Sequence, residues 1–256
     1  MDIAGLAGIG LAFVGILVAA IMEGTSPMAL LAPSALILVF GGTIGACLAS
    51  GVLKDTIGAL QAAIKTLTAK VSESSAVVDD IVKLAERARR EGLLALEDAA
   101  KAIENPFLQR GLQMAIDGTD PEELREILEG EIAAKKKTEK VYAGWFTNAG
   151  AYGPTIGIIG TVIGLIHTLA SLSEPEKLGE MIAAAFTATL WGVLTANVMW
   201  FPLGKRIARV SELEAGQMEL VVEGILAIQA GSNPRIVAQK LKSLLPDSGG
   251  AEKKAA

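Results

Sequence analysis

The sequence contains four apolar stretches, each long enough for a helix to cross a lipid bilayer. They cover about residues 3–22, 29–50, 149–172 and 181–203, and none of them contains Asp, Glu, Lys or Arg. A hydrocarbon core of about 30 Å takes roughly 20 helical residues to span. Hydrophobic residues make up 51% of the chain, which is high for a soluble protein. We therefore predict an all-α, polytopic membrane protein with four transmembrane helices.

Short polar links group these stretches into two hairpins. EGTSP joins the first two stretches and SEPEKLGE joins the last two. The chain thus divides into a hairpin (1–50), a polar insertion (51–148), a second hairpin (149–203) and a tail (204–256). No basic residue precedes the first stretch, so we expect it to be retained as a span. The end of the tail, LLPDSGGAEKKAA, is expected to be disordered.

The distribution of basic residues predicts the orientation in the membrane. Of the 23 Lys and Arg residues, 14 lie in the insertion and 8 lie after residue 204, which leaves only Lys177 for the opposite face. Basic residues accumulate on the cytoplasmic side of membrane proteins. We expect both termini and residues 51–148 to be cytoplasmic, with two short loops outside.

The insertion has the pattern of a helical domain. In residues 76–91 an apolar face of Val77, Ile81, Leu84 and Ala88 recurs at spacings of three and four, opposite charged residues. Gly92 is a plausible helix stop. Further on, Asp120 and Pro121 form an N-cap and first helical position, and that helix runs on toward the third span.

Residues that could carry enzymatic chemistry are scarce. The chain has one histidine, His167, and one cysteine, Cys47, so a zinc site or a Cys-His pair within one chain is excluded. No phosphate-binding loop motif is present, and a net charge of −5 without Arg-rich helices argues against nucleic-acid binding. We predict a protein that is not an enzyme and holds no metal or cofactor.

The third and fourth spans offer glycines, hydroxyls and one imidazole. Gly153, Gly157, Gly160 and Gly164 share one helical face, which lets a neighbouring backbone approach closely. The hydroxyls of these spans either bond their own backbone at i−4 or line a path for a small cation: Thr155, Thr161, Thr168, Thr187, Thr189 and Thr195. His167 is either a proton relay or, more commonly for a lone histidine, a structural residue. An ion relay would therefore need a carboxylate from a partner.

One charged block carries the most specific signal. ARREGLLALE, residues 88–97, resembles the segment of the bacterial flagellar stator A subunits (the MotA and PomA family) that contacts the rotor. In that family an arginine and a glutamate eight positions later meet the rotor switch protein FliG. The resemblance puts Arg89 and Glu97 in these roles and Arg90 where some relatives have a second basic residue.

Two membrane segments resemble the same family, in the same order. YGPTIGIIGTVIGLI, residues 152–166, is similar to its third span and puts Pro154 at a functional proline. AFTATLWGVLTANVMWFPL, residues 185–203, is similar to its fourth span and puts Thr189 at the pore-facing threonine and Pro202 at a second proline. Without the resemblance, either proline is equally well explained as punctuation at the end of a helix.

The resemblance implies the function of a flagellar stator subunit in the bacterial inner membrane. A ring of identical A subunits, a pentamer in the family, would surround the paired helices of a MotB- or PomB-like subunit that supplies the membrane aspartate. Ion flow through this channel would generate torque. Sodium-driven relatives tend to carry threonine at the positions of Thr161 and Ala188. Thr161 therefore favours sodium and Ala188 argues against it, so the conducted ion is either a proton or sodium.

Three alternatives remain beside the stator interpretation. A self-contained cation transporter would use His167 and the threonines as a complete path. An energy-transducing protein of the ExbB and TolQ type would have three spans and lack the charged block. A membrane scaffold would conduct no ions.

Overall fold

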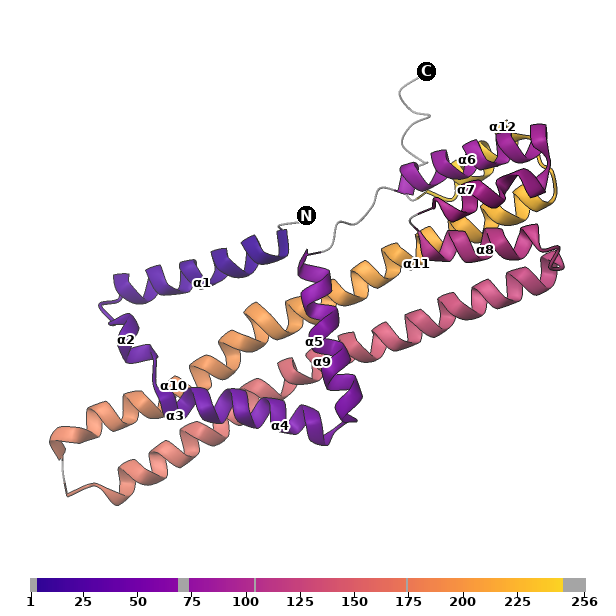
Figure 1. The fold of residues 1–256 in the computed structure, drawn as a ribbon. Helices are drawn as coiled ribbons and strands as arrows, with labels where there is room; N and C mark the ends of the chain where they lie inside the picture. The colour runs from indigo at the N-terminus through magenta and orange to yellow at the C-terminus, as the bar shows by residue number, and fades with distance from the viewer. Residues whose placement is uncertain (1–3, 69–73, 104, 174, 246–256) are drawn as a thin grey trace. The chain divides into compact units, whose positions relative to one another are not determined.

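The computed structural model describes residues 4–68, 74–103, 105–173 and 175–245, and every regular element in these ranges is a helix (Figure 1). This confirms the all-α prediction. Contacts divide the chain into two compact units, residues 1–70 with 138–210 and residues 71–137 with 211–256. The expected disorder of the tail falls almost entirely on residues 246–256, which lie outside the described ranges.

The first unit holds the apolar helices. Its elements are α1 (Ala4–Met22), α2 (Pro27–Leu30), α3 (Pro33–Leu36), the π-turn η1 (Ile37–Gly41), α4 (Gly42–Ala49), α5 (Leu53–Thr68), the short 3₁₀ turn η3 (Pro175–Lys177), α10 (Leu178–Thr195), the π-turn η4 (Ala196–Trp200) and parts of α9 (Pro121–Ala170) and α11 (Phe201–Gln229). A cluster of rings lies inside this unit, with the centroids of Trp145 and Trp200 6.1 Å apart in an edge-on contact. The indole N–H of Trp145 donates to the hydroxyl of Thr56 at 3.0 Å, which ties α5 to α9.

Three helical stretches of the described residues are long and apolar enough to span a membrane: α1, α9 and the continuous run from Pro175 to Gln229. The predicted second span at 29–50 differs. Its helix begins only at Pro33 and continues through η1 to Ala49, 17 residues. Ala32 has an extended backbone (φ −86°, ψ 107°) because the proline that follows it disfavours the helical conformation.

The third and fourth predicted spans belong to longer helices. α9 runs for 50 residues from Pro121 to Ala170, and Asp120 caps it by accepting a hydrogen bond from the backbone N–H of Glu122 at 2.9 Å. This confirms the prediction that the helix beginning at Pro121 runs on toward the third span. Likewise α11 continues past residue 203 to Gln229 and is followed by α12 (Pro234–Ser243), so the expected tail is helical over most of its length.

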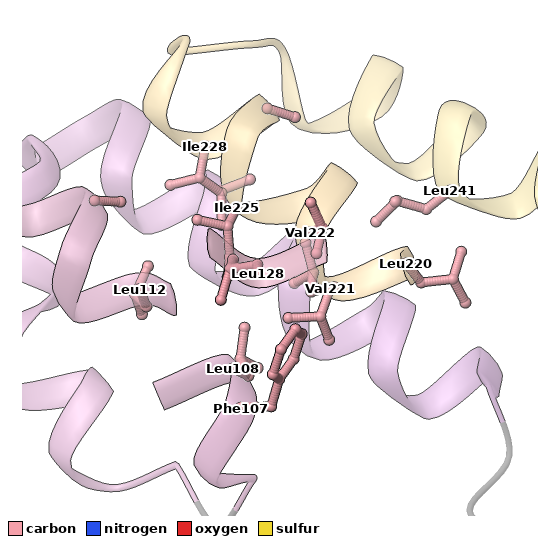
Figure 2. Packing of buried hydrophobic residues seen from close by; sticks show 14 of the residues in the cluster. Phe107, Leu108, Leu112, Leu128, Leu220, Val221, Val222, Ile225, Ile228 and Leu241 are labelled. Atoms are coloured by element: carbon pink, nitrogen blue, oxygen red, sulfur yellow. The ribbon is translucent and has the colours of Figure 1, made fainter. Parts of the chain in front are cut away.

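The second unit packs around one aliphatic core. Its elements are α6 (Ser74–Glu91), the 3₁₀ turn η2 (Leu93–Leu96), α7 (Glu97–Lys101), α8 (Pro106–Ile116), α12 and the remaining parts of α9 and α11. Figure 2 shows Leu128 of α9 next to Ile225 of α11, two helices that are far apart in sequence. The predicted helix at 76–91 is confirmed. Its buried line is Val78, Ile81 and Ala85, so Ile81 is buried as predicted, whereas Val77, Leu84 and Ala88 are half-buried at the edge of the core.

Candidate functional site

The backbones of α9 and α10 touch along the predicted glycine face. A Cβ atom added at Gly192 of α10 would lie 2.5 Å from the carbonyl oxygen of Gly153, and one added at Gly157 would lie 2.8 Å from that of Ala188. Further along, a Cβ at Gly164 would meet the Cβ of Ala185 at 2.5 Å. No side chain fits between backbones this close, so the glycines set the distance between the two helices. The interpretation of the glycine face as a packing surface is confirmed.

Two threonines meet across this contact. The hydroxyl oxygens of Thr161 and Thr189 are 2.5 Å apart, and either one is able to donate to the other. Thr161 also lies within hydrogen-bond distance of the carbonyl oxygens of Ala185 (3.1 Å) and Gly157 (3.3 Å), and Thr189 of that of Gly157 (3.2 Å). Two hydroxyl protons thus serve more acceptors than they can bond at once. The result is a half-buried group of oxygens between two apolar helices.

The hydroxyls of the other four threonines of these spans donate to backbone carbonyl oxygens of their own helix. Thr168, Thr187 and Thr195 each donate to the carbonyl oxygen four residues earlier, at 2.9, 3.0 and 2.7 Å. Thr155 donates to the carbonyl oxygen of Tyr152 at 2.8 Å. Because their hydroxyls are used within one helix, they are poor candidates for lining a path. The structure therefore singles out Thr161 and Thr189 from the six threonines.

Both predicted prolines lie inside continuous helical stretches. Pro154 is in the interior of α9, so the explanation as a helix end is wrong for it. A proline there removes one backbone hydrogen bond and loosens the helix locally. Pro202 is the second residue of α11 and directly follows the π-turn η4, whose wider winding accommodates the proline ring. Each proline is a point at which a long helix is able to bend.

His167 lies on α9 about 9 Å along the helix axis from Thr161. It borders an open cavity of about 450 Å³ between α3, α9 and α10, together with Ser34, Leu38 and Ala188. The walls of this cavity are mostly apolar, and no carboxylate borders it. Neither Thr161 nor Thr189 is among the residues that line this cavity.

The charged block lies on the surface of the second unit. Arg89 and Arg90 end α6, Gly92 makes the break with a φ of +86°, and Glu97 begins α7. All three charged side chains are exposed, and neither arginine has an ion-pair partner among the described residues. Beneath them Ile81 and Leu96 are fully buried, so the block rests on the aliphatic core.

Two neighbours of this block were missed by sequence reasoning. Lys101 forms an ion pair with Glu97 at 3.0 Å, and this hydrogen bond raises the pKa of Lys101 above its ordinary value. Leu94 has 75% of its surface exposed on the turn between Arg90 and Glu97. The i, i+4 spacing of Glu97 and Lys101 is a signal that the sequence offered. The exposure of Leu94 becomes visible only once the turn is built.

A network of ion pairs holds the helices of the second unit together. Glu223 on α11 accepts from Arg125 on α9 at 2.8 Å and from Lys240 on α12 at 2.5 Å. Partial burial acts to raise the pKa of Glu223, but the hydrogen bonds from Lys240 and Arg125 outweigh it and lower the pKa below its ordinary value. This carboxylate stabilises the unit that carries the charged block.

Comparisons with known proteins agree on one family. Residues 99–220 match the MotA/TolQ/ExbB proton channel family. The chain is 36% identical over 250 residues to "Motility protein A" of Bacillus subtilis (strain 168), covering 96% of this chain and 92% of that one. It is 33% identical over 245 residues to "Chemotaxis protein PomA" of Vibrio alginolyticus, covering 96% of both.

Two solved structures resemble the whole chain. The C. jejuni MotAB structure superimposes with a TM-score of 0.92 at 30% identity over 96% of each chain. The flagellar MotAB stator complex from Bacillus subtilis superimposes with a TM-score of 0.88 at 36% identity over 98% of each chain. The likeness therefore covers nearly the whole length of the chain.

Proposed function

The chain belongs to the MotA/TolQ/ExbB proton channel family, with the motility protein A subunits as its relatives, and on this basis we propose that it is the A subunit of a flagellar stator. It acts as a multi-pass inner-membrane protein that forms an ion channel with a B subunit and converts ion flow into torque. The observation that carries this is the pairing of Thr161 with Thr189 between two apolar stretches, residues 149–172 and 181–203, that contain no carboxylate. A group of hydroxyl and carbonyl oxygens without a carboxylate is suited to line an ion path whose titrating group comes from another chain.

We propose four spans, with Pro33–Ala49 as the second. At 1.5 Å per residue its 17 residues extend about 26 Å, close to the thickness of the hydrocarbon core. The bias of basic residues supports cytoplasmic termini and a cytoplasmic insertion. This arrangement puts the charged block and its core in the cytoplasm, and the two short loops outside.

The B subunit supplies the ion-binding carboxylate in this proposal. Carboxylates are costly inside a membrane and are kept there for function. An aspartate of a B helix beside the threonine pair would exchange its ion with hydroxyl and carbonyl oxygens, which are suitable ligands for a small cation. A ring of A subunits, a pentamer by family resemblance, then surrounds the B helices, with membrane lipid outside.

We propose that Arg89, Arg90 and Glu97 contact the rotor protein FliG. Their exposure on a rigid core suits a contact that is made and released repeatedly. Leu94 adds an apolar side chain between the charges. Glu97 already forms an ion pair with Lys101, so a basic residue of the rotor must displace Lys101 to bind Glu97. When the rotor residue leaves, the ion pair with Lys101 forms again.

The prolines connect the two sites in the proposed mechanism. Loss of charge on the partner's aspartate changes the packing against α9 and α10, and the helices are able to bend at Pro154 in α9 and at Pro202, near the start of α11. Because α9 and α11 continue from the first unit into the second, bending changes the direction of the helices that support the charged block. Ion flow is worth about 2.3 kcal/mol per elementary charge for each 100 mV of membrane potential.

Ion flux in vesicles tests the channel part of the proposal. We expect flux only when this chain is combined with a B subunit bearing a membrane aspartate, and none when that aspartate is replaced by asparagine. Measuring proton and sodium flux separately identifies the ion. Flux from this chain alone would instead establish the self-contained transporter, and absence of flux with every B subunit would favour the scaffold.

A further inference from the structure

A second cavity of the first unit lies between α1, α2 and α10. Its volume is about 270 Å³, and its walls are Phe13, Ile16, Leu17, Pro27, Leu30, Leu31, Leu190, Trp191 and Leu194. Neither Thr161 nor Thr189 lines this cavity, so it is not part of the proposed ion path. We propose that an acyl chain of a membrane phospholipid occupies this cavity and fills the space between α1 and α10. The inference depends on the proposed membrane placement of these helices.

The polar groups at the cavity wall are already paired. The indole N–H of Trp191 donates to the carbonyl oxygen of Leu30 at 2.7 Å, and the backbone N–H of Leu31 donates to that of Met28 at 3.1 Å. A buried water needs two to four polar partners, and the side chains around this cavity offer none. Water is therefore a poor occupant, and an empty space of this size would be costly.

The cavity is continuous with the surface that faces the lipid. Leu17 and Leu31, two of its lining residues, are 42% and 48% exposed. None of the apolar stretch Gly5–Met22 is buried within the chain, so in the proposed membrane placement this helix presents an apolar surface that lipid is able to cover. A lipid tail thus reaches the cavity without crossing a polar barrier.

The uncharged lining also decides which part of the lipid is recognised. The cavity walls contain no Lys, Arg, Asp or Glu, and the nearest link, residues 23–27, contributes only Glu23. No cation is positioned there for a phosphate group. Binding should therefore depend on the acyl chain and be insensitive to the charge of the headgroup.

The three tryptophans of the chain provide a built-in test. Trp191 lines the cavity, whereas Trp145 and Trp200 are buried, with only 7% and 6% of their surfaces exposed. We would reconstitute the chain with its B subunit in vesicles of phosphatidylcholine brominated in the middle of the acyl chain, and record tryptophan quenching. Most of the quenching should disappear in Trp191→Phe, which assigns it to Trp191.

A filling variant distinguishes the cavity from bulk lipid. Ile16→Phe places a larger ring in the cavity, and Leu11→Phe makes the same kind of change on the opposite, 74% exposed face of α1. We expect Ile16→Phe to reduce the quenching of Trp191 and Leu11→Phe to leave it unchanged, in both zwitterionic and anionic brominated vesicles. Equal quenching in both variants would mean that Trp191 only faces bulk lipid, and no quenching would mean that a protein side chain fills the space. Either result overturns the proposal.

Failure of this inference is separable from failure of the stator function. Flotation of the vesicles first establishes that the chain is inserted in the membrane. Ion flux measured on the same vesicles reports the channel, whatever the quenching shows. Normal flux without quenching would reject only the lipid site.

Discussion

The hydroxyl oxygens of Thr161 and Thr189 lie 2.5 Å apart, although 28 residues separate them in the chain. Their contact depends on the close approach of α9 and α10, which Gly153, Gly157 and Gly192 permit. Oxygen atoms are thereby grouped at one level of the apolar parts of these two helices. The proposed ion path and the packing of the helices are therefore one feature of the structure.

Replacing a threonine of this pair should slow ion flux. Thr161→Val keeps the shape and removes the hydroxyl, and we expect flux through the complex to fall about tenfold, which corresponds to about 1.4 kcal/mol, the contribution of one hydrogen bond. Thr161→Ser should retain most of the flux. Thr187→Val is the matched control, because that hydroxyl bonds only within its own helix. Equal effects at residues 161 and 187 would contradict the assignment.

Adding one methyl group at Gly157 should separate the two helices. The new Cβ would lie 2.8 Å from the carbonyl oxygen of Ala188, so we expect Gly157→Ala to destabilise the protein by about 1–3 kcal/mol and to abolish flux. Gly144→Ala on the same helix meets no atom within 4 Å and should be neutral or slightly stabilising. Thermal unfolding in detergent gives the comparison, and an unaltered Gly157→Ala protein would refute the packing argument.

Replacing Pro154 should stabilise the protein but reduce the torque that it generates. Pro154→Ala restores a backbone hydrogen bond and removes a residue that costs about 3 kcal/mol in a helix interior, so the free energy of unfolding should rise. We expect torque, measured as the rotation speed of tethered cells, to fall all the same, because α9 loses a point of bending. A variant that is both more stable and fully active would show that the proline has no part in the mechanism.

Reversing a charge of the exposed block should reduce torque without loss of protein from the membrane. In the proposed rotor contact, Arg90→Glu replaces an attraction by a repulsion, and since a surface pair contributes about 1 kcal/mol, rotor binding should weaken several-fold. Arg87→Glu is the comparison on the same helix, because Arg87 already pairs with Glu91 at 3.1 Å. Motility and membrane content of both variants are compared. Loss of the Arg90→Glu protein from the membrane would contradict the assignment of Arg90 to the rotor contact.

The ion pairs of Glu223 should make the second unit sensitive to acid. Since the pKa of Glu223 is lowered in the folded state, its stabilising contribution is present above the ordinary value of 4.5 and is lost as the pH falls through the lower folded value. We expect Glu223→Gln to cost about 1–2 kcal/mol at pH 7 and less in strong acid. Urea unfolding at the two pH values, monitored by circular dichroism, measures the difference. A cost that does not change with pH would mean that the charge of Glu223 contributes nothing.

Patterns of adjacent residues predicted which segments are helical more accurately than they predicted the helix boundaries and buried faces. The cap at Asp120, the helix at 76–91 and the break at Gly92 follow from hydrogen-bonding and steric preferences of a few adjacent residues, and all three are present. The second span begins four residues later than predicted, and Val78 and Ala85 of α6 are buried in place of their neighbours Val77 and Leu84. In both places hydrophobicity alone does not locate the boundary, since Pro33 and the packing of distant helices decide it.

The sequence by itself determined the apolar helices, the glycine face, the absence of a carboxylate within the spans and the family, because each is written in the spacing and identity of residues close together in the chain. Only the tertiary structure decided that Thr161 and Thr189, among six threonines, bond across two helices, and that α1 leaves a cavity against Trp191. These relationships depend on how two surfaces meet at atomic distance. A helix pattern specifies which face is apolar, but the partner that covers it and the register of their contact arise from packing between residues far apart in the chain.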